Sequence, residues 1–296
     1  MRKIFLMTTV LLSIVRGLFA IEPEAAKAYQ PIIVEMLTGR FQAPAKPQNQ
    51  SFSPIVSAGP IATPLYNNYS GKWESPKSDT KGTTAVINIE GAIMKNDNCG
   101  APGTKTMASW LQAVENNPNF IGAVIICDSP GGDVSGTDLL ANQIKNMSKP
   151  VATVVNGLCC SAAYWIASAS DTILSDSSNN TIGSIGTYCT LQDWSGYMEK
   201  MGVKLIEVYA TQSTEKNKIY KDAMAGDTSG LTDQVTAINN NFLSAVRSNR
   251  YSKKMKYSEA FTGRTYQSQD AIDSGLIDGM GTLDDAISFI QKQSRS

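Results

Sequence analysis

From residue 84 onwards, short apolar runs alternate with amphipathic stretches. Apolar runs bounded by turn residues predict buried strands, and they occupy residues 85–89, 121–127 and 151–155. Apolar positions at helical spacing follow each of them, at residues 107–115, 134–147 and 161–169. Strands that alternate with helices predict βαβ units, so we expect an α/β fold with a mainly parallel sheet.

Shorter elements follow in the second half of the chain. Residues 172–174 and 181–187 have the composition of short strands, and residues 204–209 alternate apolar and polar positions as a strand does. A long helix is predicted at residues 231–249. Helix and turn patterns then alternate to about residue 290.

The first 83 residues have a different pattern. Residues 1–40 have helical spacing that ends at Gly39, which predicts an N-terminal helical arm. Residues 41–83 are rich in Pro, Ser, Asn and Gly without a period, which is typical of a linker. We therefore expect one folded domain at residues 84–296, preceded by the linker and the arm.

The start of the chain allows two interpretations. Two basic residues precede an apolar stretch at residues 4–15, and Phe19-Ala20 fits the end of a cleavage site, which is the outline of a signal peptide. Arg16 interrupts that outline, and the apolar run is short for a membrane span. A signal or anchor segment and an arm that docks on a partner chain both stay open.

Charge and histidine content narrow the function. Lys+Arg and Asp+Glu both number 26, so charge gives no reason to expect nucleic acid as a partner. The chain contains no histidine, which excludes a Ser-His-Asp triad, a Cys-His dyad and a His-ligated metal site within it. A hydrolase built on this chain needs Lys, Asp, Glu, Tyr or a terminus to move its proton.

Five cysteines, an odd number, lack the spacing of a disulfide framework and of a metal site. Cys127 lies in an apolar run and is expected in the core, and Cys159 and Cys160 are adjacent. Reduced thiols in a reducing compartment are the simplest interpretation.

Two glycine-rich motifs follow predicted strands. Residues 128–133 (DSPGGD) come directly after a buried strand, and Gly131 and Gly132 allow a sharp turn that points amide groups at a ligand. Residues 181–186 (TIGSIG) form a short strand punctuated by glycine, which indicates close approach of another backbone. An ordinary turn and a packing contact are the structural alternatives.

Two further motifs carry reactive side chains. Residues 156–165 (NGLCCSAAYW) predict a turn of small residues that places the Ser161 hydroxyl at a helix start, where the helix field favours an oxyanion. Ser161 could equally be an N-cap. Lys216, Lys218 and Lys221 form a cluster that is a solvated loop unless one amine lies beside Ser161.

In this order and spacing, the four motifs resemble the signal peptide peptidase A family of serine peptidases. The resemblance covers about residues 84–290 and includes residues 263–266 (GRTY) and 271–278 (AIDSGLID), which look like the family's closing signature. It implies a ClpP/crotonase-like fold, a superhelix of repeated ββα units. It also implies a homo-oligomer that acts on peptide or protein substrates without a metal or organic cofactor.

The resemblance assigns the site residue by residue. Ser161 matches the nucleophile and Ser184 the serine that orients the lysine. Lys216 matches the general base, with Lys218 as the alternative, and the base can come from the same chain or from a neighbour. The oxyanion and substrate-binding positions match Gly131, Gly132 and Ala162.

Several settings remain possible for such an enzyme. The segment at residues 16–23 and the helix after it resemble phage-type members, which implies maturation of capsid or scaffold proteins in the host cytoplasm. A membrane-associated or periplasmic signal peptide peptidase is the alternative. A crotonase-like acyl-CoA enzyme and an inactive assembly protein are further alternatives, because fold alone does not decide function.

Overall fold

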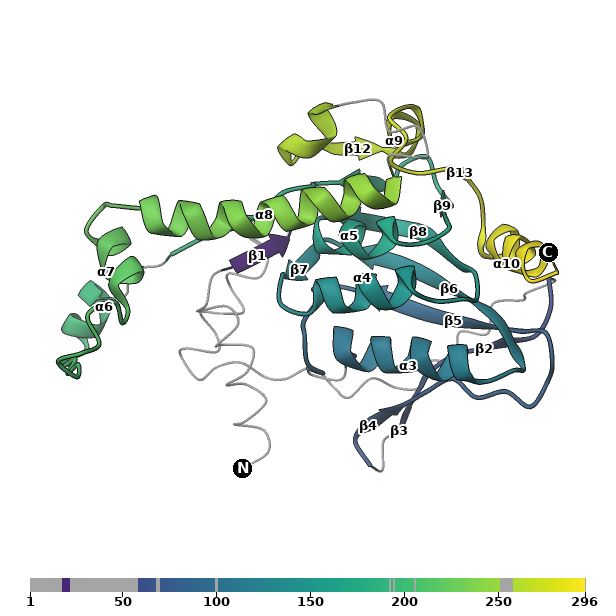
Figure 1. Ribbon diagram of the computed structural model, residues 1–296, viewed down its shortest axis with the longest axis horizontal. Coiled ribbons are helices and arrows are strands. Elements are labelled where there is room, and N and C mark those ends of the chain that lie inside the picture. The colour runs from purple at the N-terminus through teal and green to yellow at the C-terminus, as the bar shows by residue number, and fades with distance from the viewer. Residues whose placement is uncertain are drawn as a thin grey trace.

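The computed structural model describes residues 18–21 and 58–295, apart from residues 68–69, 99–100, 192, 194, 205 and 251–257. In this part of the chain, the centre is a sheet of eight strands (Figure 1). They are β2 (Ile61–Ala62), β5 (Thr83–Glu90), β6 (Phe120–Ser129), β8 (Val151–Cys160), β9 (Thr172–Ser175), β10 (Thr181–Gly183), β12 (Thr265–Gln267) and β13 (Gly279–Met280).

The main path of the sheet runs β12-β10-β8-β6-β5-β2. The first half of β8 also pairs with β9, and β9 pairs with β13. Among the described strands of this sheet, every pair is parallel except β10 with β12. The prediction of an α/β fold with a mainly parallel sheet is confirmed.

Helices cover both faces of this sheet. On one face lie α3 (Thr104–Asn116), α4 (Thr137–Lys145) and α5 (Ala162–Ser168), and α8 (Ser229–Arg250) lies over α5, with the rings of Trp165 and Phe242 stacked at 4.8 Å. The helix α10 (Leu283–Gln293) covers the other face. Successive residues of β6 face opposite sides, as in any strand, so Ile125 joins the larger core and Val124 packs with α10.

Two predicted elements differ from the structure. β8 continues to Cys160, where the sequence suggested a turn, because its second half leaves β9 and pairs with β10. The strand predicted at residues 204–209 is absent from the residues described there. Its apolar positions Ile206 and Val208 are 76% and 90% exposed, and no described strand pairs with this segment.

The N-terminal region also differs from its prediction. Leu18–Ile21 form a strand, β1, so the helix predicted for residues 1–40 is wrong at these four residues, and the others lie outside the described residues. β1 joins a second, three-stranded sheet between β7 (Gly131–Asp133) and β11 (Tyr188–Cys189). Within the predicted linker, β2 pairs with β5, and β3 (Leu65–Asn67) pairs with β4 (Lys72–Glu74).

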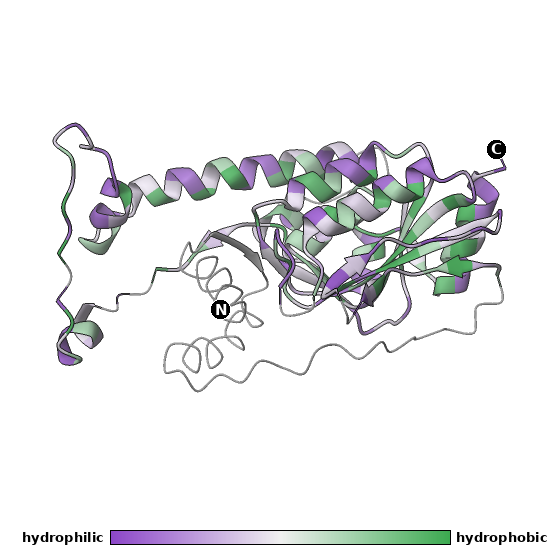
Figure 2. Ribbon diagram, turned by 90° about the horizontal axis from the view of Figure 1, so that it is seen from below, coloured by the Kyte–Doolittle hydropathy of each residue, from purple (hydrophilic) through white to green (hydrophobic). Residues whose placement is uncertain are grey.

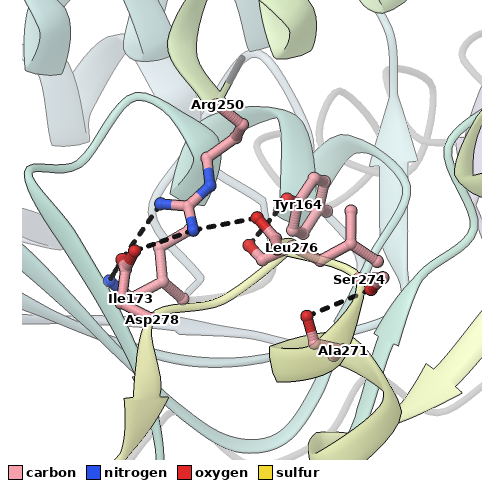
Figure 3. Close-up of polar contacts among 8 residues, drawn as sticks. Tyr164, Ile173, Arg250, Ala271, Ser274, Leu276 and Asp278 are labelled. Atoms are coloured by element: carbon pink, nitrogen blue, oxygen red, sulfur yellow. Dashed lines mark hydrogen bonds and ion pairs between the residues drawn. The ribbon is translucent and has the colours of Figure 1, made fainter. Parts of the chain in front are cut away.

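A buried ion pair fastens the C-terminal signature to the end of α8 (Figure 3). Both terminal nitrogens of the fully buried Arg250 donate to the Asp278 carboxylate at 3.0 Å, and one also donates to the Gly275 carbonyl. The Tyr164 hydroxyl donates to the Leu276 carbonyl at 2.8 Å. The same turn, which follows α9 (Ser268–Asp273), is thereby held by α8 and by α5.

A projection extends from the other end of α8. It contains α6 (Ser195–Lys200) and α7 (Lys218–Met224), and both views show it reaching away from the sheet (Figures 1 and 2). We call the described residues between 195 and 228 the lysine arm. Within the described part of the chain, no helix combines the length and apolar character that crossing a membrane requires.

Candidate active site

Ser161 stands at the sharp junction between β8 and α5. Its φ and ψ are 55° and −119°, a conformation that L-residues rarely adopt and that costs roughly 1–3 kcal/mol. The residue is buried, and its N–H donates to the Gly183 carbonyl at 2.7 Å. The surrounding structure therefore holds Ser161 in a strained turn, which is a feature that clusters at functional sites.

The Ser161 side chain is free of a capping role. Although Ser161 precedes α5, its hydroxyl does not cap the helix, so the N-cap interpretation is wrong. The hydroxyl donates to the Gly186 carbonyl at 3.4 Å, which is long for an O–H···O bond. It is thus aimed toward the segment after β10 without being tied to a strong acceptor.

Ser184 lies in that same segment, directly after β10. Its φ is 51°, its N–H donates to the Arg264 carbonyl at 2.8 Å, and the residue is buried. β10 ends at Gly183, earlier than predicted, because the backbone turns at Ser184. Position 183 itself needs glycine, since a Cβ there would lie 2.8 Å from the Arg264 carbonyl oxygen. The bond from Ser161 N–H to Gly183 brings the two predicted serines into one site.

The Gly131-Gly132 pair forms the edge strand β7, where the sequence suggested a turn. Gly131 has a φ of 100°, which favours glycine. A Cβ on Gly132 would lie 2.1 Å from the Ile93 carbonyl oxygen, so no other residue fits there. The positive φ explains the glycine at position 131, and packing against residue 93 explains the glycine at position 132.

Two elements that carry the predicted oxyanion amides, β7 and α5, contact each other next to Ser161. Ala162 is the first residue of α5, where helical N–H groups have no acceptor within the helix. The structure therefore brings Gly131, Gly132, Ala162, Ser161 and Ser184 into one region, as the sequence predicts. Their catalytic roles stay predictions.

The predicted lysine bases lie elsewhere. Lys216 and Lys218 are exposed in the lysine arm, where Lys218 is the first residue of α7, whereas Ser161 directly precedes α5. Figure 1 shows α7 beyond the end of α8 and α5 beside the sheet. A hydrogen bond and ion pair with Asp222 at 2.5 Å raise the pKa of Lys218. Within one chain, the arm and the serine are apart.

Lys221, the third member of the cluster, has a similar environment. Its amine lies 3.1 Å from Glu207 and 4.1 Å from the centre of the Tyr209 ring, and the hydrogen bond with Glu207 is the main cause of its raised pKa. A raised pKa keeps an amine charged, and a charged amine cannot accept a proton. Their contacts in the exposed arm therefore keep Lys218 and Lys221 in the charged state, which is the wrong state for a base.

The surroundings of Cys159, two residues before Ser161, make its thiol a poor nucleophile. Cys159 is fully buried, and its contact with Cys127 and its burial raise the pKa of the Cys159 thiol. The four described cysteines are free thiols, which agrees with the expected reduced state, and Cys99 lies outside the described residues. The hydroxyl of Ser161 is the better nucleophile candidate at this junction.

Sequence reasoning missed two features of the site. It did not find β1, because the four-residue run Leu18–Ile21 is too short to show a strand period and was included in the helical pattern expected for residues 1–40. It also missed the contact between Asp128 and β8, in which the Leu158 N–H donates to the Asp128 carboxylate at 2.9 Å. A Cβ on Gly157 would lie 2.4 Å from the same carboxylate, so a glycine facing an acidic residue was the available signal.

Comparison with known proteins adds a family. The model of peptidase family S49 matches residues 143–295, just over half of the chain. That range includes Ser161, Ser184 and the lysine arm, and it begins after Gly131 and Gly132.

Individual relatives are more distant. Protease 4 of Haemophilus influenzae is 26% identical over 69% of this chain and 33% of its own length. Capsid assembly protease C of Escherichia phage lambda is 27% identical over 70% of this chain and 48% of its own. The chain spans 33% to 59% of the length of the first curated relatives it matches. Among solved structures, a ClpP1 mutant from Listeria monocytogenes is 14% identical, with a TM-score of 0.43, over 68% of this chain and 94% of that chain.

Proposed function

The chain belongs to peptidase family S49, and on that premise we propose that it is a serine endopeptidase whose nucleophile is Ser161. The observation that carries the proposal is the strained, buried backbone of Ser161 next to strand β7, where Gly131 has a positive φ and Gly132 has no room for a Cβ. Such a junction presents a hydroxyl to a substrate carbonyl while neighbouring amides receive the negative charge.

The chemistry follows from this placement. The Ser161 Oγ attacks a peptide carbonyl carbon, and its proton passes to a neutral lysine amine. The amides of Gly132 and Ala162 stabilise the oxyanion, and Gly131 supplies the backbone turn that exposes the Gly132 amide. The lysine then protonates the leaving amine, and water hydrolyses the acyl-enzyme.

Lysine can do this only when it is desolvated. A free lysine has a pKa of ~10.4, and a base useful near neutral pH needs roughly 7–8, a difference of ~4 kcal/mol. Burial in an apolar environment supplies such a shift. Since the lysine arm is exposed in one chain, the base in this proposal is a lysine of a neighbouring copy, Lys216 first and Lys218 as the alternative.

The surface of the lysine arm supports assembly. It carries most of the exposed large apolar side chains in the described part of the chain: Tyr197, Met201, Val203, Ile206, Val208, Ile219, Tyr220 and Met224. Apolar side chains gathered on one projection are typical of an interaction surface. A second copy that covers them also desolvates the lysines, so assembly and activation are one event in this proposal.

For the substrates, we favour capsid or scaffold proteins during phage head assembly. The support is the 27% identity to capsid assembly protease C together with the resemblance of residues 16–23 to phage-type members. A membrane-associated signal peptide peptidase is the second candidate, because a protein named a signal peptide peptidase of Enterococcus faecium is 26% identical. Family membership favours a peptidase over a crotonase-like acyl-CoA enzyme.

The test is peptide cleavage followed by mass spectrometry, for wild type and Ser161→Ala. We expect the variant to lose cleavage while it keeps its fold by circular dichroism. Cleavage that persists in Ser161→Ala contradicts the nucleophile assignment. A wild type that cleaves no peptide or protein at any concentration contradicts the proposal and favours an inactive assembly protein.

A further inference from the structure

A strand of the chain itself lies on the candidate oxyanion strand. β1 pairs antiparallel with β7 on one side and with β11 on the other (Figure 1). The registers are Ala20 opposite Gly132 and Phe19 opposite Tyr188. Residues 18–21 therefore fill the space between the two edges with extended backbone.

The pairing of β7 with residue 93 shows which way the Gly132 amide points. The Ile93 N–H donates to the Gly131 carbonyl at 2.9 Å, and the Asp133 N–H donates to the Ile93 carbonyl at 2.8 Å. Backbone groups of successive strand residues point to opposite edges. The N–H and C=O of Gly132 thus face the other edge, where β1 lies.

This geometry selects one carbonyl. In an antiparallel pair, residues that face each other through their backbone groups exchange two hydrogen bonds. Ala20 is opposite Gly132, so the Ala20 carbonyl is the group directed at the Gly132 amide. An added extended strand is a general way to bind a peptide on a sheet edge, and here the carbonyl at the oxyanion position belongs to the chain itself.

We propose that residues 18–21 are a built-in substrate and that the enzyme cleaves its own chain between Ala20 and Ile21. This inference rests on the proposed function of Ser161. The Ser161 Oγ bonds to the Ala20 carbonyl carbon, and the C–N bond to Ile21 breaks. The proton from Ser161 passes through the lysine to the new amine of Ile21. Water then hydrolyses the ester, which restores the Ser161 hydroxyl and leaves a carboxylate on Ala20.

Self-cleavage follows assembly in this scheme. In a single chain, β1 lies on β7 while the lysine arm points away from the sheet, so the bond is held without a base. Arrival of a neighbouring lysine permits cleavage, and departure of residues 1–20 frees the edge of β7 for other substrates. The uncut chain is therefore latent in two ways, by occupancy of the strand site and by lack of the base.

The experiment uses the full chain made in a membrane-free translation system, so that no signal peptidase is present. Intact mass and N-terminal sequencing are followed over time at low and high protein concentration. We expect wild type to begin at Ile21 after incubation, faster at high concentration. Ser161→Ala should still begin at Met1, with the rate lowered by at least about 10³-fold.

A backbone variant tests the register independently of Ser161. Ala20→Pro removes the N–H that pairs with the Gly132 carbonyl, and it should block cleavage at this bond. Ala25→Pro, four residues beyond β1 in sequence, is the matched control and should be cut after Ala20 like wild type. Casein is included in every sample as an external substrate.

The outcomes separate this inference from the proposed function. Casein cleavage by a chain that still begins at Met1, or that is cut at a different bond, overturns the self-cleavage and leaves the peptidase standing. A new terminus at Ile21 in Ser161→Ala shows that another protease made the cut, which also overturns it. If neither casein nor the chain is cut, both proposals fail.

Discussion

The two members of the proposed dyad, Ser161 and the lysine, differ in how far a single chain provides the environment that each needs for catalysis. Ser161 is buried, held at an unusual φ, and hydrogen-bonded to Gly183, where a Cβ would lie 2.8 Å from the Arg264 carbonyl oxygen. The lysine arm is exposed, and ion pairs raise the pKa of Lys218 and Lys221. In the proposed mechanism, the single chain therefore provides the environment of the nucleophile and of the oxyanion site, and assembly provides that of the base.

Mixing two inactive variants tests this contrast most strongly. Ser161→Ala and Lys216→Ala should each lose at least about 10³-fold in activity. If the base comes from a neighbour, mixed assemblies should regain activity at about a quarter of their sites. The measurement is peptide cleavage after the two proteins are denatured together and refolded.

The same mixing identifies the lysine. Lys218→Ala and Lys221→Ala are tested in parallel, and only the variant of the true base should be inactive alone and active in the mixture. Mixtures that stay inactive for all three lysines would place the base within the same chain or outside this cluster.

Gly132→Ala should lower activity by disturbing the predicted oxyanion site. A methyl group 2.1 Å from the Ile93 carbonyl displaces β7 and its amide, and loss of one oxyanion donor lowers kcat by about 10²–10³-fold. Gly279→Ala is the matched control, because a Cβ there meets nothing within 4 Å. Steady-state kinetics on the two variants decide; equal activity would remove Gly132 from the oxyanion site.

Arg250→Ala should destabilise the body of the molecule without touching the arm. It removes two charge-assisted hydrogen bonds between the buried guanidinium and the partly exposed Asp278 carboxylate, which costs about 1.5–3 kcal/mol. Urea unfolding measures the free-energy change. Arg247→Ala, whose guanidinium stacks on the exposed side of α8 against Phe261, should cost far less; equal losses would mean that the ion pair is not the anchor.

The pH profile should report the state of the lysine arm. Only a neutral amine accepts the Ser161 proton, so activity rises as pH increases through the pKa of the lysine. Asp222 and Glu207 raise the pKa of Lys218 and Lys221 in the single chain, whereas burial by a partner lowers it. We therefore expect the midpoint to move to lower pH as protein concentration increases. A flat profile between about pH 6 and pH 10 would exclude a lysine base.

A charge on the exposed arm should give the smallest effect on stability and a clear effect on assembly. Val208 is 90% exposed, so Val208→Asp should change the free energy of unfolding by no more than about 0.5 kcal/mol. It should lower the oligomer mass in analytical ultracentrifugation. Leu65→Asp, at a 58% exposed position on β3, is the control that should leave the oligomer intact.

An element could be predicted when the pattern that specifies it lies within its own residues, and not when it depends on pairing with a distant segment. Some elements could be predicted because their apolar patterns are long enough to show a period, as in β5, β6, α3 and α8. The second half of β8 was not, because its strand character depends on pairing with β10, which comes about twenty residues later. β7 and β1 are too short to show a period, and each is a strand because it pairs with the other.

The site divides in the same way. Ser161 and the glycine pair could be predicted because their chemistry is local: a hydroxyl at a strand-to-helix junction and a turn that needs glycine. The lysine could be placed only within a cluster, because in the proposed mechanism its role depends on contacts between copies. The segment at residues 204–209 has the alternation of a strand, yet its described residues pair with no strand in the part of the chain that the structure describes.

The length of the helix α8 also sets how far the lysine arm lies from the sheet. Its 22 residues correspond to a length of about 33 Å, with the Arg250 anchor at one end and the lysine arm at the other. The span between the two therefore depends on the number of residues in α8. Inserting one residue in the middle would lengthen it by about 1.5 Å and rotate the arm by about 100° around the axis. A peptidase that borrows its base from a neighbour would then tolerate changes of side chain along α8 far better than changes of length.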